Sequence, residues 1–236
     1  SGVFTGGTVN YSFASVSADV AVATVADGAS DVTLTPVAVG ATDVTVTMTD
    51  ANGVDATDTF TVTVVAATSL SAAIADQEMT VGGNAIDLDL AAAFAGGFGP
   101  YTYAGAAVDA AVGTATEDAG TLTLAAVAVG STDVQYSATD ANGVSADTTF
   151  TLKVNAAPTA TAIADFTIDV IDAPAVFTSG TDFTFAGGTG AIAITGAASS
   201  DDAVATVVFD DVAGTVTVDG VGVGTAEVTV TGTDAN

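Results

Sequence analysis

One pentapeptide repeats along this chain and constrains its fold more than any other feature. Thr-Asp-Ala-Asn-Gly occupies residues 49–53 and returns ninety positions later at 139–143, and Thr-Asp-Ala-Asn returns again at 233–236. The flanking residues repeat too, since the octapeptides at 37–44 and 127–134 differ at a single position. Self-similarity at a long fixed period indicates a tandem array of like units. We therefore interpret the chain as three copies of one module of about 90 residues.

The residues around each pentapeptide alternate with the period of a β-strand. Apolar residues alternate with threonines at 44–48, before the first copy, and at 60–64, after it. A period of two is expected of a strand with one buried face. The Asn-Gly pair between the two runs indicates a tight turn, because both residues accept positive φ. Val and Thr also dominate the rest of the chain and favour strands over helices, so the pattern predicts an all-β fold.

Short strands punctuated by Gly or Asp, in units of this size, are typical of immunoglobulin-like β-sandwiches. Connectors without alternation occur at 64–72 and 154–162, and Pro158 in the second connector blocks continuation of a central strand. These features predict three domains: residues 1–66, a repeat that lacks its first strands; residues 67–157, a complete repeat; and residues 158–236, a repeat that lacks its last strand.

Two explanations fit the missing strands. The chain is a fragment of a longer array, or a neighbouring subunit supplies the strand by β-augmentation, which would give head-to-tail polymers. Both explanations predict that the partners of this chain are copies of itself or flanking repeats of the same kind.

Charge excludes several classes of function. The chain carries 28 acidic residues against one base, Lys153, and a net charge of −27. Such a surface repels phosphate backbones, which excludes nucleic acid as a partner. No apolar run reaches the twenty residues that a membrane span needs, so membrane insertion is not expected.

The sequence also lacks the residues of most catalytic sites. There is no His and no Cys, so a Ser nucleophile has no base and thiol catalysis is impossible. Paired carboxylates at 201–202 and 210–211 could serve glycoside hydrolysis, but that chemistry needs a raised pKa in a cleft with sugar-stacking aromatics, and there is no Trp. We interpret these pairs as loop tips and expect no enzymatic activity.

The stretch from Val-Ala-Val-Gly-Ser-Thr-Asp-Val at 127–134 through 139–154, followed by Asn-Ala-Ala-Pro-Thr, resembles bacterial tandem repeats of surface proteins. The nearest are the dystroglycan-type cadherin-like and the putative-Ig families. The resemblance covers nearly the whole chain. It implies an extracellular stalk, adhesin or filament of stacked sandwiches, which in some cases is stiffened by calcium.

In cadherin-like families an Asp-Ala-Asp stretch ligates calcium, and the Asp-Ala-Asn of each turn is similar to it. The resemblance therefore implies calcium ligands at Asp50, Asn52, Asp140, Asn142, Asp234 and Asn236. Hard cations take six to eight oxygen ligands, and a turn with Asp-x-Asn offers two close together. The chain lacks the other cadherin stretches, Leu-Asp-Arg-Glu and Asp-x-Asn-Asp-Asn. The alternative is a purely local role, because Asp and Asn favour turns for their own hydrogen bonds.

These observations lead to one expected function and one alternative. We expect a structural segment of an extracellular filament, stalk or surface adhesin, polymerised in one version by strand complementation between subunits. The alternative is an adhesin module that binds a glycan or a protein, with surface glycans gripped by aromatic residues such as Tyr101 and Tyr103 or by the acidic loops.

Overall fold

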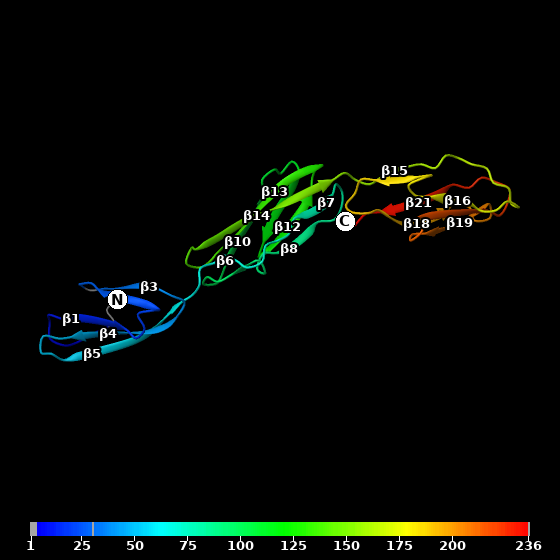
Figure 1. Cartoon of the computed structure of the whole chain (residues 1–236). Coiled ribbons are helices and arrows are strands. Elements are labelled where there is room, and N and C mark those ends of the chain that lie inside the picture. Colours follow the sequence, from blue (N-terminus) through cyan, green and yellow to red (C-terminus); the bar gives the residue numbers. More distant parts are fainter. Residues whose placement is uncertain (1–3, 30, 236) are drawn as a thin grey trace. The chain divides into compact units, whose positions relative to one another are not determined.

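The computed structural model describes residues 4–29 and 31–235 and contains β-strands but no helix over those residues (Figure 1). The prediction of an all-β chain is confirmed. No helix in this part of the chain is long and apolar enough to cross a membrane.

The strands of the described residues form eight sheets. Every sheet lies within one of the three predicted ranges, so no strand pairs with a strand of another repeat. Spatial clustering divides the chain differently, into two compact units. One comprises the described residues up to Ser69 together with Phe94–Thr102 and Thr139–Ala146, and the other comprises the remaining described residues. The repeat boundaries themselves stay a prediction.

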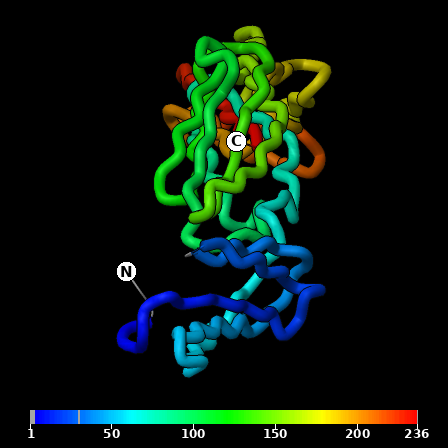
Figure 2. Tube along the Cα trace, turned by 90° about the vertical axis from the view of Figure 1, so that its left-hand side faces the viewer, coloured from blue at the N-terminus to red at the C-terminus, as the bar shows by residue number. Residues whose placement is uncertain are grey.

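The second repeat has two sheets. Its strands are β6 (Ser69–Leu70), β7 (Gln77–Thr80), β8 (Ile86–Asp89), β9 (Phe94–Ala95), β10 (Thr102–Ala107), β11 (Gly113–Asp118), β12 (Thr121–Ala126), β13 (Gly130–Thr139) and β14 (Ser145–Asn155). One sheet has the order β10-β13-β14-β7 and the other the order β11-β12-β8, while β6 pairs with β9. In the second sheet β11 and β12 form an antiparallel hairpin, and β8 pairs antiparallel with the other edge of β12. Most of this repeat is drawn in green in Figure 2.

The two sheets of the second repeat pack face to face. A Cβ on Gly105 of β10 would overlap a methyl group of Leu122 on β12, and a Cβ on Gly113 of β11 would lie 2.7 Å from a methyl group of Leu152 on β14. The core between them is made of fully or nearly fully buried side chains: Met79, Leu90, Leu122, Leu124, Val134, Tyr136, Phe150, Leu152 and Val154. This is the β-sandwich that the sequence predicts.

The first repeat has fewer strands than the second. Its strands are β1 (Ser12–Ser17), β2 (Ala23–Asp27), β3 (Val32–Pro36), β4 (Gly40–Thr49) and β5 (Asp55–Val64). They form the sheet β1-β4-β5 and the hairpin β2-β3. Val44 and Met48 of β4 are buried as the alternation predicts, but Phe60 of β5 is 39% exposed, whereas its counterpart Phe150 is 4% exposed. The described residues of this repeat include no counterparts of β7 and β8, which accounts for the difference.

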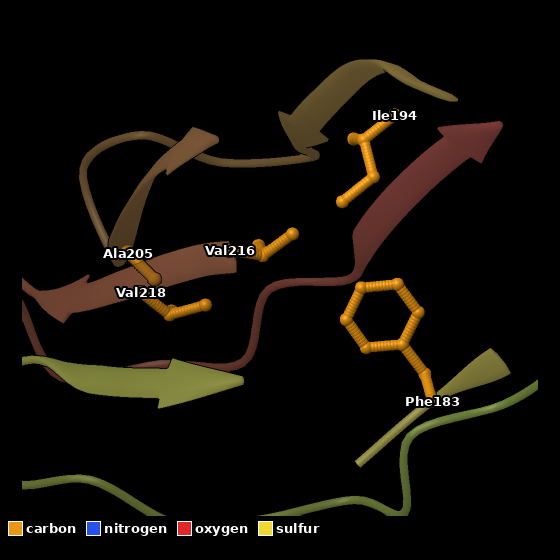
Figure 3. Close-up of a cluster of buried hydrophobic side chains, with 5 residues drawn as sticks. All are labelled: Phe183, Ile194, Ala205, Val216 and Val218. Atoms are coloured by element: carbon orange, nitrogen blue, oxygen red, sulfur yellow. The ribbon is translucent and has the colours of Figure 1, made fainter. Parts of the chain in front are cut away.

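The third repeat has the strands β15 (Thr159–Thr161), β16 (Ala175–Thr178), β17 (Thr184–Ala186), β18 (Ala193–Ser199), β19 (Ala205–Asp210), β20 (Thr215–Gly220) and β21 (Val228–Thr233). The sheets are β16-β20-β19, β18-β21 and β15-β17. Side chains from β18, β19 and β20, and from the residue just before β17, converge on one small core, drawn in Figure 3: Phe183, Ile194, Ala205, Val216 and Val218.

The pentapeptide turn lies between β4 and β5, as predicted, and again between β13 and β14. Its geometry differs from the predicted tight turn, in which both residues of the Asn-Gly pair would use positive φ. Gly53 has a φ of 78°, but Asn52 does not have positive φ, and the N–H of Gly53 donates to the carbonyl of Asp50 at 2.9 Å. The turn is therefore a four-residue turn closed by a left-handed glycine, and only one residue of the Asn-Gly pair uses positive φ.

Candidate functional site: the Asp-Ala-Asn turns

The first residue of each Asp-Ala-Asn turn organises the turn itself. In the first repeat one carboxylate oxygen of Asp50, Oδ1, accepts backbone N–H groups from Asn52 at 2.8 Å and from Val54 at 3.0 Å. The second repeat has the same arrangement, in which Oδ1 of Asp140 accepts from Asn142 and Val144. An Asp that caps its own turn in this way is a common local motif.

The second carboxylate oxygen reaches a loop far away in sequence. Oδ2 of Asp50 accepts the backbone N–H of Thr8 at 3.0 Å, and Oδ2 of Asp140 accepts that of Phe98 at 3.0 Å. In both cases the donor is the residue that directly follows a Gly-Gly pair. We call this carboxylate-to-loop contact the Asp latch.

The third repeat repeats the latch. Oδ2 of Asp234 accepts the backbone N–H of Thr189, which follows Gly187–Gly188, at 2.8 Å. The same oxygen accepts the hydroxyl of Thr80 at 2.6 Å. Asn236, the remaining predicted ligand of this turn, lies outside the described residues.

The Gly-Gly pairs are needed to bring the loop so close. All three pairs have positive φ, which side chains rarely adopt. A Cβ on Gly97 would lie 2.9 Å from Oδ2 of Asp140, and a Cβ on Gly188 would lie 2.8 Å from Oδ2 of Asp234. Any other residue at the second glycine would therefore crowd the carboxylate as well as strain the backbone.

In the first two repeats a tyrosine also binds the same loop. The hydroxyl of Tyr11 donates to the carbonyl of Gly6 at 3.0 Å, and the hydroxyl of Tyr101 donates to the carbonyl of Gly96. These two residues occupy equivalent places in their repeats. Their hydroxyls are thus engaged within the fold, and the loops are held at both ends.

The latch stabilises the ionised form of the aspartates. Hydrogen bonds from the backbone N–H groups of Val54 and Thr8 lower the pKa of Asp50. For Asp140 the N–H of Val144 is the largest cause of the lowered pKa, and burial opposes it. The Thr68 hydroxyl, buried beside this carboxylate, also lowers the pKa of Asp140, although it makes no hydrogen bond of regular geometry to any described residue. Hydrogen bonds to a carboxylate favour its charged form.

These donors decide whether the turn fits a calcium ion. Both oxygens of Asp50 and of Asp140 already accept N–H groups, whose positive ends face the place that a cation would take. The side-chain nitrogen of Asn52 donates to the Thr8 hydroxyl at 2.7 Å, which orients the amide but does not occupy its oxygen, the atom that could ligate a cation. Among residues 4–29 and 31–235, no three acidic side chains gather where they could hold a metal. The donor set fits calcium poorly, and calcium binding stays an untested prediction.

The other acids near the turns pair with threonines across the strands. The Thr61 hydroxyl donates to Asp43 at 2.7 Å, and the Thr49 hydroxyl donates to Asp55 at 2.6 Å. The single base, Lys153, bridges Glu78 at 3.1 Å with both side chains about half exposed. Exposed pairs of this kind add little to stability.

Sequence analysis identified the aspartates of the latch but not the loops whose N–H groups they accept. It interpreted the aspartates as turn residues or metal ligands and did not connect them with the Gly-Gly pairs. The signal that could have joined them was already present, since Gly-Gly and Asp-Ala-Asn recur together in all three copies.

No protein-family model matches the chain, and no curated protein matches its sequence. Among solved structures, the chain is similar to the I-band fragment I67–I69 from titin, with 10% identity and a TM-score of 0.41, over 95% of this chain and 84% of that one. It is also similar to the extracellular cadherin domains 1–4 of protocadherin gamma B7, with 11% identity and a TM-score of 0.33, over 96% of this chain and 66% of that one. For the extracellular domain of protocadherin gamma B4 the values are 12% and 0.30, over 95% of this chain and 43% of that one.

Proposed function

We propose that this chain is a structural segment of an extracellular filament, stalk or surface adhesin built from immunoglobulin-like modules in series. The observation that carries the proposal is the Asp latch, which occurs once in each repeat and always takes the backbone N–H of the residue that follows a Gly-Gly pair. In each repeat the first acid of the Asp-Ala-Asn turn, Asp50, Asp140 or Asp234, accepts a hydrogen bond from a distant loop. A chain that reproduces one stabilising device three times is suited to a mechanical role.

The surface suits exposure outside a cell. A net charge of −27 keeps an array hydrated and self-repelling. One basic residue in 236 leaves a trypsin-like protease a single place to cleave. Threonine-rich exposed strand faces, such as that of β5, add polar surface without adding cleavage sites.

In its finer form the proposal includes assembly. The modules are stacked within a longer array or are joined between subunits by strands that one molecule lends to another. Either arrangement makes copies of the same kind of repeat the natural partners of this chain.

Electron microscopy of the native material, labelled with an antibody raised against this chain, tests the proposal. We expect labels at regular intervals along threads or stalks outside the cell. Labelling confined to the cell interior, or to particles without extended form, would contradict the structural role.

A further inference from the structure

Two turns of this chain combine the residues that favour spontaneous loss of a side-chain amide. Asn52 and Asn142 are each followed by glycine. An asparagine loses its amide when the next backbone nitrogen attacks its side-chain carbonyl, and glycine, which has no Cβ, lets that nitrogen approach most readily. The residues around the two asparagines are identical, Thr-Asp-Ala-Asn-Gly-Val at 49–54 and at 139–144. Any difference in their reactivity therefore comes from the fold.

The two turns also share most of their geometry. Both asparagines are exposed. In the first turn the N–H of Gly53 donates to the carbonyl of Asp50 at 2.9 Å, and in the second the N–H of Gly143 donates to that of Asp140 at 3.0 Å. A Cβ on either glycine would meet nothing within 4 Å, so both turns are open on that side. Because the hydrogen bond holds the attacking nitrogen, folding slows the reaction in both turns to a similar extent.

The contacts of the side-chain amide distinguish the two turns. The amide nitrogen of Asn52 donates to the Thr8 hydroxyl at 2.7 Å. In the second repeat Phe98 takes the place of Thr8, and its backbone N–H makes the same latch, but its side chain has no hydroxyl. The side chain of Asn142 makes no hydrogen bond to any residue that the structure describes. The Asn142 amide is therefore free to rotate toward the nitrogen of Gly143, whereas the Asn52 amide is held.

We propose that Asn142 is a site of spontaneous deamidation and that the Thr8 hydroxyl protects Asn52 from the same change. In this reaction the backbone nitrogen of Gly143 forms a bond to the side-chain carbonyl carbon of Asn142. The bond from that carbon to the amide nitrogen breaks, and ammonia leaves with the proton that the Gly143 nitrogen gives up. Water then opens the resulting succinimide ring at either carbonyl, which leaves aspartate or isoaspartate at position 142.

Either product weakens the latch of the second repeat. A carboxylate at position 142 lies two residues from Asp140, and like charges at short range repel. Isoaspartate also adds a methylene to the main chain between the N–H groups of residues 142 and 144, both of which donate to the Asp140 carboxylate. This changes the spacing of the two donors. Deamidation thus loosens the second repeat with age, while the first repeat keeps its turn.

Mass spectrometry of the two turns measures both rates within one molecule. The intact chain is incubated in its folded state in mildly alkaline buffer, which promotes loss of the glycine amide proton, and is then cleaved. We expect Asn142 to be converted about fivefold faster than Asn52, the factor that one ordinary hydrogen bond supplies. In urea at a concentration that unfolds the chain, both rates should rise and become equal, because the local sequences are identical.

Substitutions at Phe98 test the hydroxyl without disturbing a core, since Phe98 is 56% exposed. F98T supplies a hydroxyl in the place that Thr8 takes in the first repeat, and it should slow the conversion of Asn142 to the rate of Asn52. F98V has a similar shape without the hydroxyl and should leave the rate as in the natural chain. In the first repeat T8V should speed the conversion of Asn52, while T8S, which keeps the hydroxyl, should not.

Three results for the folded chain would overturn the proposal: equal rates in the two turns, a faster rate at Asn52, or equal slowing of Asn142 by F98T and F98V. An Asn142 that stays intact for the time in which the unfolded chain is fully converted would overturn it too. F98T keeps the test decisive should T8V loosen the first repeat, because it predicts a gain of protection rather than a loss.

Discussion

The carboxylate of Asp140 accepts the backbone N–H of Phe98 at 3.0 Å, across 42 positions of sequence. This hydrogen bond joins a turn between two strands to a glycine loop that enters another strand. Equivalent bonds join Asp50 to Thr8 and Asp234 to Thr189. A charged acceptor makes stronger hydrogen bonds than a neutral one. The latch therefore adds a polar contribution to the stability of each repeat, beside the apolar contribution of its core.

The latch requires a glycine at position 97, and two alanine variants separate the reasons. G143A imposes a left-handed backbone on Ala, with no atom near the new Cβ, and should cost about 1–2 kcal/mol. G97A imposes the same strain and also crowds the Asp140 carboxylate and the Thr68 hydroxyl. We therefore expect G97A to lower the free energy of unfolding of the second repeat by more than G143A does, as measured by amide hydrogen exchange. Equal losses would show that the close approach of the loop is unimportant.

Stability should depend on pH through Asp140. Its folded-state pKa is lowered from 3.8, so its contribution is fully present above that value and is lost as pH falls through the lowered pKa. D140N removes this titration but leaves the rest of the acidic surface. The difference in Tm between the natural chain and D140N should be constant near neutrality and shrink below about pH 4. A difference that stays constant down to the lowest pH at which the chain folds would contradict the role of the ionised latch.

Calcium should leave the turns unaffected, since N–H donors fill both oxygens of Asp140. We expect the same Tm with excess chelator as without it. Calcium and magnesium at equal ionic strength should shift the Tm equally, because the charge of −27 attracts any divalent ion. A shift specific to calcium that disappears in D140N would restore the metal-site interpretation.

Equivalent phenylalanines should differ in their contribution to stability. Phe150 is 4% exposed between two sheets, and F150A should cost about 3–5 kcal/mol in the second repeat. Phe60 occupies the same place in the first repeat but is 39% exposed, so F60A should cost less than about 1 kcal/mol. Amide hydrogen exchange in β14 of the F150A variant and in β5 of the F60A variant measures the loss of stability in each repeat. Similar costs would mean that a further strand covers Phe60 in solution.

Much of the fold follows from the sequence alone. Alternation around Val44 and Met48 predicted a strand with those two residues buried, and the pentapeptide predicted the turn that follows. Local periodicity is sufficient there, because a strand and its hairpin partner are adjacent in sequence. The exposure of Phe60 could not be predicted from its own alternation, since it depends on whether other strands cover it.

The site was harder to predict for a related reason. The residue types of Asp50 and Asp140 indicate oxygen ligands or turn formers equally well. What decides between these roles is the N–H of Thr8 or Phe98, which comes from a loop 42 residues away. The prediction of positive φ for the Asn-Gly pair held for Gly53 but not for Asn52. The reason is that the Asp50 carboxylate accepts the N–H groups of Asn52 and Val54 and so fixes the turn in another geometry.

Single-molecule extension of the chain tests the central claim, that like modules each fold around their own core and latch, most directly. We predict that the second repeat unfolds in one abrupt event, which lengthens the chain by roughly 250–300 Å for a module of about 90 residues, and that D140N lowers the force of this event. Gradual extension without such an event, or a single event that releases all 236 residues together, would contradict the account.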